Sequence, residues 1–260
     1  MSNIDFKDRR VLLTGATAGV GYSIAEQLLM NGARVVITGR SGERGLKACE
    51  TLGARGECHF VAGNAAQWDS ASACVEEAAR LMGGLDVLVS AGAEGAVTPM
   101  PFAEMTPEQL EASFTSRVFG RIFPVRAALS HLSAGERSSI VMITTDAGRH
   151  ATPGEAIVGA TGASIILLTK ALAREFSRLK IRVNSVALTL TSDTPSWDRI
   201  FSNPTFENRL FSKALSRFPA GRAPTSTEVS HAAVFLASDL ASQITGQTIS
   251  VNGGLSFGGW

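Results

Sequence analysis

Short runs of β-branched and apolar residues alternate along the chain with longer stretches in which apolar residues recur at helical spacing. This alternation is typical of βαβ units, which place parallel strands in one sheet and helices on both of its faces. Strands are predicted at residues 10–14, 34–38, 57–61, 86–90, 139–144, 182–186 and 248–251. Helices are predicted near residues 20–31, 42–53, 68–82, 106–132, 155–179 and 226–238. We therefore expect an α/β fold with one doubly wound parallel sheet of about seven strands.

The chain shows no repeat, low-complexity tract or linker, so residues 1–260 are predicted to form a single domain. Residues 191–222 depart from the alternation because they are rich in proline and aromatic residues. An insertion of this length is typical of a lid or a binding loop. It fits equally well a pair of helices whose aromatic side chains only pack on the body. In either case we expect substrate or partner specificity to reside there.

Charge and cysteine content exclude several classes of protein. The 24 basic and 23 acidic residues leave a net charge of +1, which provides no basic field for nucleic acid or an anionic membrane. The three cysteines are widely spaced and form no C-x-x-C pair, so neither a disulfide framework nor a metal site is predicted. No apolar run has the length of a signal peptide or a membrane span, and we expect a soluble, cytoplasmic protein.

A glycine-rich loop follows the first predicted strand and reads Thr14-Gly15-Ala16-Thr17-Ala18-Gly19-Val20-Gly21. Glycines at a strand–helix turn allow backbone N–H groups to approach a pyrophosphate at the positive end of the helix. The loop resembles the T-G-x-x-x-G-x-G fingerprint of the short-chain dehydrogenase/reductase family. The resemblance continues through residues 85–89, 182–186 and the C-terminal segment 221–254, so it covers nearly the whole chain.

This resemblance implies a Rossmann sheet with strand order 3-2-1-4-5-6-7, a nicotinamide dinucleotide, and dimers or tetramers formed through the helices after strands four and five. It implies dinucleotide binding by residues of the loop and of later strand ends: Gly15, Thr17, Gly19, Val20, Gly21, Arg40, Asn64 and Ala91. Arg40 stands where a basic residue would accept the 2′-phosphate of NADP. Asn64 stands where the family often has an aspartate that binds the adenine amino group.

Members of this family use a tyrosine as the general acid/base, a lysine four residues later, a serine thirteen residues before the tyrosine, and an asparagine on an earlier helix. The lysine cation lowers the phenol pKa, and the serine orients the substrate oxygen. In this chain the four positions are occupied by Arg117, Thr145, Val158 and Gly162. The Asn-Asn-Ala-Gly motif of the fourth strand reads Ser90-Ala91-Gly92-Ala93. The acid, its cationic partner and the asparagine are therefore all replaced.

Other residues offer few substitutes for the tyrosine and the lysine. Tyr22 is the only tyrosine and lies on the helix that follows the glycine loop, at the far end of the dinucleotide. Lys170 is eight residues beyond Gly162, about 12 Å along a helix, and cannot reach the site. Thr145, Asp146 and His150 remain as candidates near the end of the fifth strand, although a lone loop histidine is more often an ordinary surface residue and Asp146 is as easily a turn residue.

An intact scaffold with an altered tetrad leads to one hypothesis and two alternatives. The hypothesis is a catalytically silent subunit that pairs with an active paralogue in a hetero-oligomeric alcohol or hydroxyacyl-CoA dehydrogenase. One family precedent is the 2-[hydroxy(phenyl)methyl]succinyl-CoA dehydrogenase of anaerobic toluene degradation, in which one subunit has degenerated in this way. The first alternative is an active NAD(P)-dependent oxidoreductase with non-standard catalytic residues. The second is a binding module that senses the dinucleotide.

Overall fold

Residues 4–92 and 98–257 of the chain are described by a computed structural model. Seven parallel strands form one sheet in the order β3-β2-β1-β4-β5-β6-β7. The strands are β1 (Arg10–Thr14), β2 (Arg34–Gly39), β3 (Cys58–Ala62), β4 (Val87–Ser90), β5 (Ser139–Thr145), β6 (Arg182–Leu188) and β7 (Thr248–Val251). The predicted fold class, strand number and single Rossmann-like domain are confirmed.

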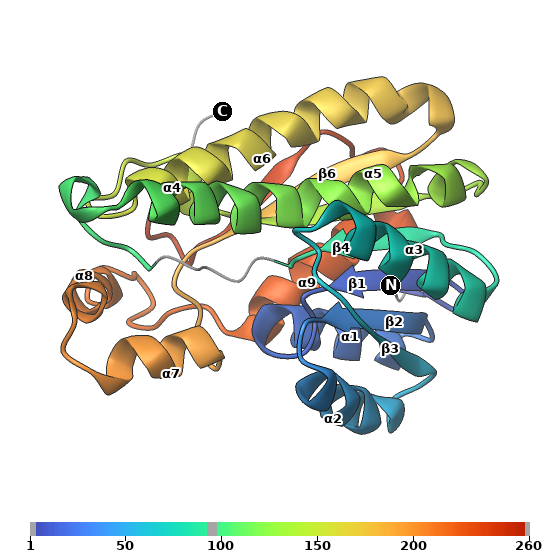
Figure 1. Cartoon of the computed structure of the whole chain (residues 1–260), viewed down its shortest axis with the longest axis horizontal. Helices are drawn as coiled ribbons and strands as arrows, with labels where there is room; N and C mark the ends of the chain where they lie inside the picture. The colour runs from blue at the N-terminus through green and yellow to red at the C-terminus, as the bar shows by residue number, and fades with distance from the viewer. Residues whose placement is uncertain (1–3, 93–97, 258–260) are drawn as a thin grey trace.

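Helices cover both faces of the sheet, as Figure 1 shows. The longer helices are α1 (Gly19–Met30), α2 (Gly42–Gly53), α3 (Trp68–Met82), α4 (Pro107–Phe114), α5 (Gly120–Ser133), α6 (Ala156–Phe176), α7 (Pro195–Ser202), α8 (Phe206–Leu215) and α9 (Ser226–Ala237). Short helical turns occupy Phe102–Glu104, Thr115–Phe119, Asp146–Gly148, Ser177–Leu179 and Asp239–Ala241.

Alternate residues of each strand point to opposite faces and build two apolar clusters. In β1, Val11 and Leu13 pack with α1, α2 and α9, whereas Leu12 packs with α3, α5 and α6. The five inner strands are buried on both faces, which is why they read as nearly continuous apolar runs in the sequence, whereas the edge strands β3 and β7 are only partly buried. A third, smaller cluster lies within the insertion and includes Leu190, Ile200 and Phe218.

The predicted helix 106–132 is divided by one turn of π-helix, Thr115–Phe119. Two residues of α5 explain the division. Pro124 has no N–H group to donate to the carbonyl of Gly120. The guanidinium of Arg121 donates through Nη1 to the carbonyl oxygen of Arg117 at 2.7 Å, and so provides a partner for a carbonyl within the wider turn. Such single π-turns occur frequently at functional sites.

Within the described residues, one helical stretch, Ala156–Leu179, has the length and apolar composition of a membrane span. Of the 18 consecutive residues in this stretch with the highest mean hydropathy, 33% are buried in the protein. Its inner side packs through Ile165, Ala173 and Phe176 on the apolar cluster over β5 and β6, whereas Leu167 is 67% exposed. This helix is therefore buried on the side that faces the sheet and apolar but exposed on its other side.

Candidate active site at the carboxyl edge of the sheet

The glycine loop turns back on itself between β1 and α1, and its geometry depends on glycine. Gly15 has a φ of +70°, and a Cβ atom there would lie 2.5 Å from the Cα of Gly92. A Cβ on Gly21 would overlap the carbonyl oxygen of Gly15. Ala18 is the N-cap of α1 and provides no capping side chain, so the first N–H groups of the helix point toward the loop without one. This arrangement suits the pyrophosphate of a dinucleotide.

The other predicted dinucleotide residues lie around the same loop. The Ala91 and Gly92 N–H groups donate to the carbonyl and hydroxyl oxygens of Thr14 at 3.3 and 3.2 Å, so the ends of β1 and β4 are joined. A Cβ on Gly39 would lie 2.6 Å from the methyl carbon of Thr17, which places Thr17 against the end of β2. Val20 packs on the apolar cluster beneath α1.

Arg40 and Asn64 extend this site beyond the carboxyl ends of β2 and β3. Arg40 is exposed directly after β2. The Oδ1 atom of Asn64 accepts a hydrogen bond of 3.0 Å from the Ala66 N–H, so one of its lone pairs already stabilises the local turn. Ala93, the last residue of the fourth-strand motif, lies outside the described residues.

Thr145 and Gly162, which occupy the serine and lysine positions, are in direct contact. A Cβ on Gly162 would lie 2.5 Å from the methyl carbon Cγ2 of Thr145. The carbonyl of Gly162 also accepts a 3.1 Å hydrogen bond from the Thr144 hydroxyl, which holds α6 against the end of β5. The two replacements are therefore sterically coupled, because the methyl group of threonine occupies the space that a side chain at position 162 would need.

The hydroxyl oxygen of Thr145 accepts a 3.2 Å hydrogen bond from the Ala147 N–H, which caps the short turn Asp146–Gly148. Its own hydrogen has no acceptor within the part of the chain that the structure describes. Val158 is partly exposed in the first turns of α6 and has no acid/base group. Thr145 is consequently the one member of the four tetrad positions that retains the original type of chemistry.

Arg117 lies on the π-helical turn, beside the first turn of α6. The hydrogen bond from Arg121 to its carbonyl holds the turn in place, and Arg121 also donates through Nε to the carbonyl of Ile143 in β5. Burial, and next the charge of Arg117, lower the pKa of Arg121 to about 9, so the Arg121 guanidinium is charged at neutral pH. Burial also lowers the pKa of Arg117, against the opposing effect of the carboxylates Glu155 and Glu207.

Glu155 is a functional candidate that the sequence reasoning missed. It is the N-cap residue of α6, one helical turn before Val158, and is partly buried. Burial raises its pKa to about 7, although the charge of Arg117 and a hydrogen bond with Thr152 lower it, and Glu207 raises it further. An acidic residue at the start of an otherwise apolar helix was the available signal. Its charged neighbours come from distant parts of the chain and could not be identified by spacing.

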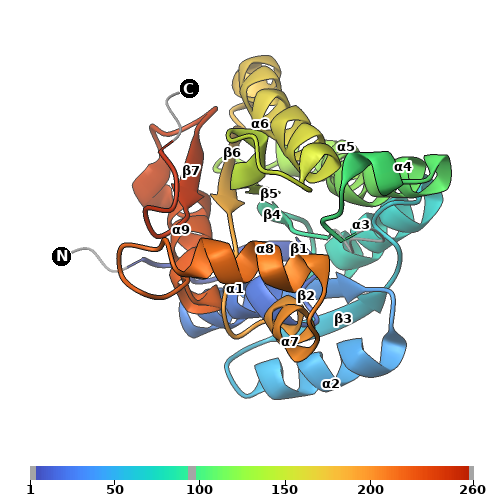
Figure 2. The ribbon, with the colours of Figure 1, turned by 90° about the vertical axis from the view of Figure 1, so that its left-hand side faces the viewer.

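The insertion lies across this edge of the sheet, with α8 in front of the strands in Figure 2. At one end, a Cβ on Gly19 of the glycine loop would lie 3.5 Å from the methyl carbon of Thr194. At the other end, a Cβ on Gly154 would overlap the ring of Phe206. Residues 191–222 thus contact both the dinucleotide loop and the start of α6.

Glu207 of α8 is only 6% exposed, and both of its carboxylate oxygens accept hydrogen bonds from the guanidinium of Arg199 in α7. This ion pair joins the two helices of the insertion. The carboxylate also acts electrostatically on Arg117 of the π-helical turn and on Glu155 at the start of α6. The insertion therefore contributes charge to the site as well as apolar surface.

Asp146 and His150 have different surroundings from those a catalytic base would need. The Asp146 carboxylate accepts hydrogen bonds from the hydroxyl of Ser250 (2.7 Å), the amide of Asn252 (2.9 Å) and the hydroxyl of Ser256. It therefore anchors the C-terminal segment to the end of β5. The buried Nε2 atom of His150 has no hydrogen-bond partner in residues 4–92 and 98–257, and so no group orients the ring.

Tyr22 and Lys170 lie away from this site. Tyr22 packs on the apolar cluster under α1, and burial raises its pKa, which makes the phenol a poorer acid. Lys170 is exposed in the middle of α6. No group of three or more potential metal-binding side chains occurs among the described residues.

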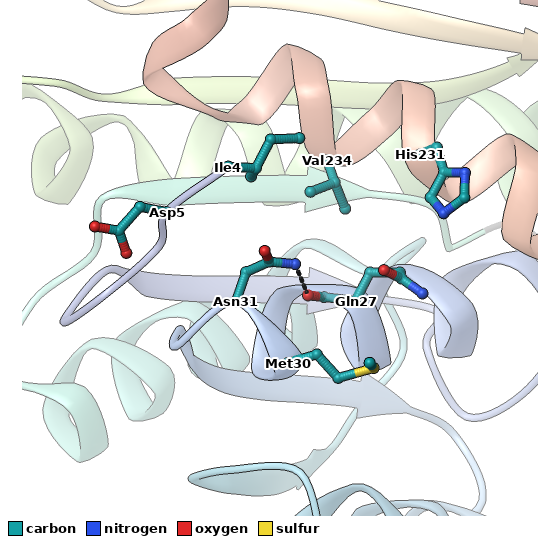
Figure 3. Close-up of a pocket in the computed structure, with 7 residues that line it drawn as sticks. All are labelled: Ile4, Asp5, Gln27, Met30, Asn31, His231 and Val234. Carbon is teal, nitrogen blue, oxygen red and sulfur yellow. Dashed lines mark hydrogen bonds between the residues drawn. The ribbon is translucent and has the colours of Figure 1, made fainter. Parts of the chain in front are cut away.

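A separate hollow lies at the opposite end of α1, close to the N-terminal segment and α9 (Figure 3). It is lined by Ile4, Asp5, Gln27, Met30, Asn31, His231 and Val234. Because α1 has 12 residues, this hollow is about 18 Å along the helix from the glycine loop. It contributes nothing to the site described above.

Comparisons with known proteins identify the chain's relatives. Residues 15–256 match a protein-family model described as enoyl-(acyl carrier protein) reductase. The chain is 30% identical to the 3-oxoacyl-[acyl-carrier-protein] reductase FabG of Aquifex aeolicus, with 94% of this chain and 96% of the relative covered. It is 28% identical to the corresponding reductase of Chlamydia pneumoniae, over 98% of this chain and all of the relative, 100%.

One similar solved structure is an NADPH-bound short-chain oxidoreductase of Pseudomonas aeruginosa PAO1, described as containing an atypical catalytic centre. It has a TM-score of 0.90 and 29% identity, and the match covers 99% of this chain and 100% of the other. The expectation of a catalytically silent subunit paired with an active paralogue is wrong, because the relatives are reductases and oxidoreductases and one with an atypical centre binds NADPH. The comparisons give no support to a hetero-oligomer or to a role in toluene degradation.

Proposed function

Because the chain belongs to the short-chain dehydrogenase/reductase family, we propose that it is an active NAD(P)-dependent oxidoreductase that interconverts a carbonyl group and an alcohol with non-standard catalytic residues. The observation that carries this proposal is the dinucleotide loop, in which Gly15 and Gly21 could not be replaced without a collision with backbone atoms. The nicotinamide, when bound, supplies or accepts the hydride.

NADP(H) is the proposed form of the dinucleotide. Arg40 follows β2 at the position where the family places the group that distinguishes the 2′-phosphate from a ribose hydroxyl, and the similar Pseudomonas structure is described as NADPH-bound. The 3-oxoacyl thioesters reduced by the bacterial relatives are the first substrate class to test. In this reaction the Thr145 hydroxyl donates a hydrogen bond that orients the substrate oxygen.

The insertion is proposed to act as a lid over the bound substrate. Its contacts with Gly19 and Gly154 connect the dinucleotide loop to α6, and its apolar cluster contains Trp197, Phe201 and Phe211. Self-assembly through α5 and α6 is also proposed, because Phe119, directly before α5, and Leu167 of α6 leave apolar surface exposed, 40% and 67% respectively. We expect a homo-oligomer in solution, and gel filtration with light scattering tests this directly.

The test of the function uses the purified chain alone. NADPH oxidation is followed with a panel of 3-oxoacyl thioesters and simple ketones, and binding of NADPH and NADH is measured by calorimetry. We expect tighter binding of NADPH than of NADH, and turnover with at least one carbonyl compound. Binding without turnover of any substrate in either direction would contradict the enzymatic proposal, and an Arg40→Ala variant that binds both dinucleotides unchanged would contradict the NADP preference.

A further inference from the structure

We propose that Glu155 gives and takes the proton that the tyrosine handles in other members of the family. This inference rests on the proposed function and adds an acid/base residue to it. Glu155 is not one of the four tetrad positions, and its assignment depends on where the fold places it rather than on a sequence motif.

The orientation of α6 is known from one contact. Gly162 lies against the methyl group of Thr145, so the side of α6 that carries residue 162 faces the end of β5. Residues three, four and seven positions apart share one side of a helix. Glu155, Val158 and Gly162 are spaced in this way, and Glu155 is about 4.5 Å along the axis from Val158. Glu155 therefore lies on the side of α6 that faces the end of β5, the side on which the tyrosine would stand.

The charged groups around Glu155 come from the elements packed against the start of α6. Arg117 lies on the π-helical turn, and Glu207, paired with Arg199, lies on α8. Thr152, in the preceding loop, accepts a hydrogen bond from the Glu155 backbone N–H at 3.0 Å and lowers the pKa of the Glu155 carboxyl group. Burial makes the carboxylate less stable while Arg117 makes it more stable, and the balance leaves the pKa at about 7. Both protonation states are thus populated near neutral pH, which is the condition for efficient general acid/base catalysis.

The Glu155 carboxyl group is the proposed proton donor for reduction and the proton acceptor for oxidation. In reduction, hydride forms a C–H bond at the carbonyl carbon, and the π electron pair of the carbonyl moves onto its oxygen. That oxygen takes the proton of the Glu155 carboxyl group, so the O–H bond of the acid breaks and the O–H bond of the alcohol forms. Arg117 stabilises the resulting carboxylate, which then regains a proton from water. In oxidation, the carboxylate of Glu155 accepts the alcohol proton.

The experiment compares Glu155→Gln with a matched control, Glu175→Gln, which changes an exposed glutamate on the same helix. We expect Glu155→Gln to lower kcat for carbonyl reduction by about 10²–10⁴-fold, with NADPH affinity and the circular dichroism spectrum unchanged. Glu155→Asp should recover part of the rate. The control variant should retain the activity of the unaltered chain, and the reductive rate of that chain should fall as pH rises through about 7.

An infrared difference spectrum gives a readout independent of turnover. When the pH is raised from one unit below to one unit above the pKa of Glu155, the unaltered chain should lose an infrared band of a protonated carboxyl group. The Glu155→Gln variant should lack this band. In Glu207→Gln this titration should move to lower pH, because the Glu207 charge raises the pKa of Glu155.

Two results would overturn the inference, and they can be distinguished. If the unaltered chain reduces a substrate and Glu155→Gln does so within threefold, the proposed function survives and Glu155 is not the acid. If the unaltered chain turns over nothing, the proposed function fails and the acid/base role fails with it.

Discussion

The two halves of the carboxyl edge of the sheet differ in how they tolerate change. At the ends of β1 and β4, the dinucleotide loop retains its glycines because a Cβ at Gly15 would collide with the backbone of Gly92. At the end of β5, the residues that carry out proton transfer in the family are replaced, and side chains rather than backbone fill the space. Where backbone atoms contact one another, a single substitution causes a collision and is not tolerated. Where side chains make the contacts, several substitutions together can produce a different but still well-packed site.

Within the β5–α6 half, the replacements compensate one another. Gly162 provides the space for the methyl group of Thr145, and Glu155, the proposed acid, stands one turn further toward the start of the helix than position 158. The absence of tyrosine from position 158 therefore does not leave the site without an ionisable group. It moves the ionisable group to another position on the same helix side, where Arg117 stands in place of the family's asparagine.

The largest effect is expected where the backbone is constrained. Gly15→Ala places a Cβ 2.5 Å from Gly92 Cα and a non-glycine residue at a φ of +70°. Overpacking and backbone strain together should lower the free energy of unfolding by about 3 kcal/mol and abolish NADPH binding. Urea unfolding and calorimetry measure the two effects. The control is Gly42→Ala, where no atom lies within 4 Å of the new Cβ. If this variant lost as much stability and NADPH binding as Gly15→Ala, the collision with Gly92 would not be the cause.

A second prediction concerns the pH dependence of stability. The folded pKa of Glu155, about 7, lies above its ordinary value of 4.5, so the folded chain binds this proton more tightly than the unfolded chain. The associated stabilisation is complete below pH 4.5 and is lost as pH rises through about 7. Relative to Glu155→Gln, the unaltered chain should lose on the order of 2 kcal/mol of its free energy of unfolding as the pH rises from 4.5 through about 7. Parallel stability curves for the two proteins, measured by denaturant titration at several pH values, would refute the shift.

The coupling between Thr145 and Gly162 can be measured by a double-mutant cycle. Gly162→Ala would normally stabilise a helix interior, but here the new methyl group meets Cγ2 of Thr145 at 2.5 Å. We expect a net loss of about 1–2 kcal/mol in the presence of Thr145 and a smaller loss after Thr145→Ser, which removes the methyl group. Additive losses in thermal unfolding would show that the two replacements are independent.

The fold could be predicted from the sequence to a greater extent than the site. Strands Arg10–Thr14 and Thr248–Val251 were predicted to the residue, because each is a short run of β-branched and apolar residues bounded by turn-forming residues. The division of the helix 106–132 was missed because it depends on a hydrogen bond from Arg121 that only the folded chain forms. Glu155 was missed because Glu207, 52 positions later, is brought to it by α8.

The error in the functional hypothesis has the same origin. The absence of tyrosine and lysine from two positions was interpreted as the absence of acid/base chemistry, although ionisation depends on the surroundings of a group and not on its place in a motif. Asp146 illustrates the opposite case. Its position beside Thr145 suggested a base, yet three donors from the C-terminal segment occupy its oxygens.

The smallest effect is expected far from both halves, at the ion pair between Arg34 and Glu57 near the start of β2 and β3. The hydrogen bonds from the Arg34 guanidinium lower the pKa of Glu57 to about 2, so its contribution is present above pH 4.5 and is lost as pH falls toward 2. Both side chains are exposed, 36% and 43%, and solvent screens their attraction. Glu57→Gln should therefore change the free energy of unfolding at neutral pH by less than about 0.5 kcal/mol and leave NADPH binding unaltered. If urea unfolding shows that Glu57→Gln loses more free energy of unfolding than this, side chains at the β3 edge of the sheet would also support the dinucleotide half. The stability of that half would then not depend on the backbone contacts of the glycine loop alone.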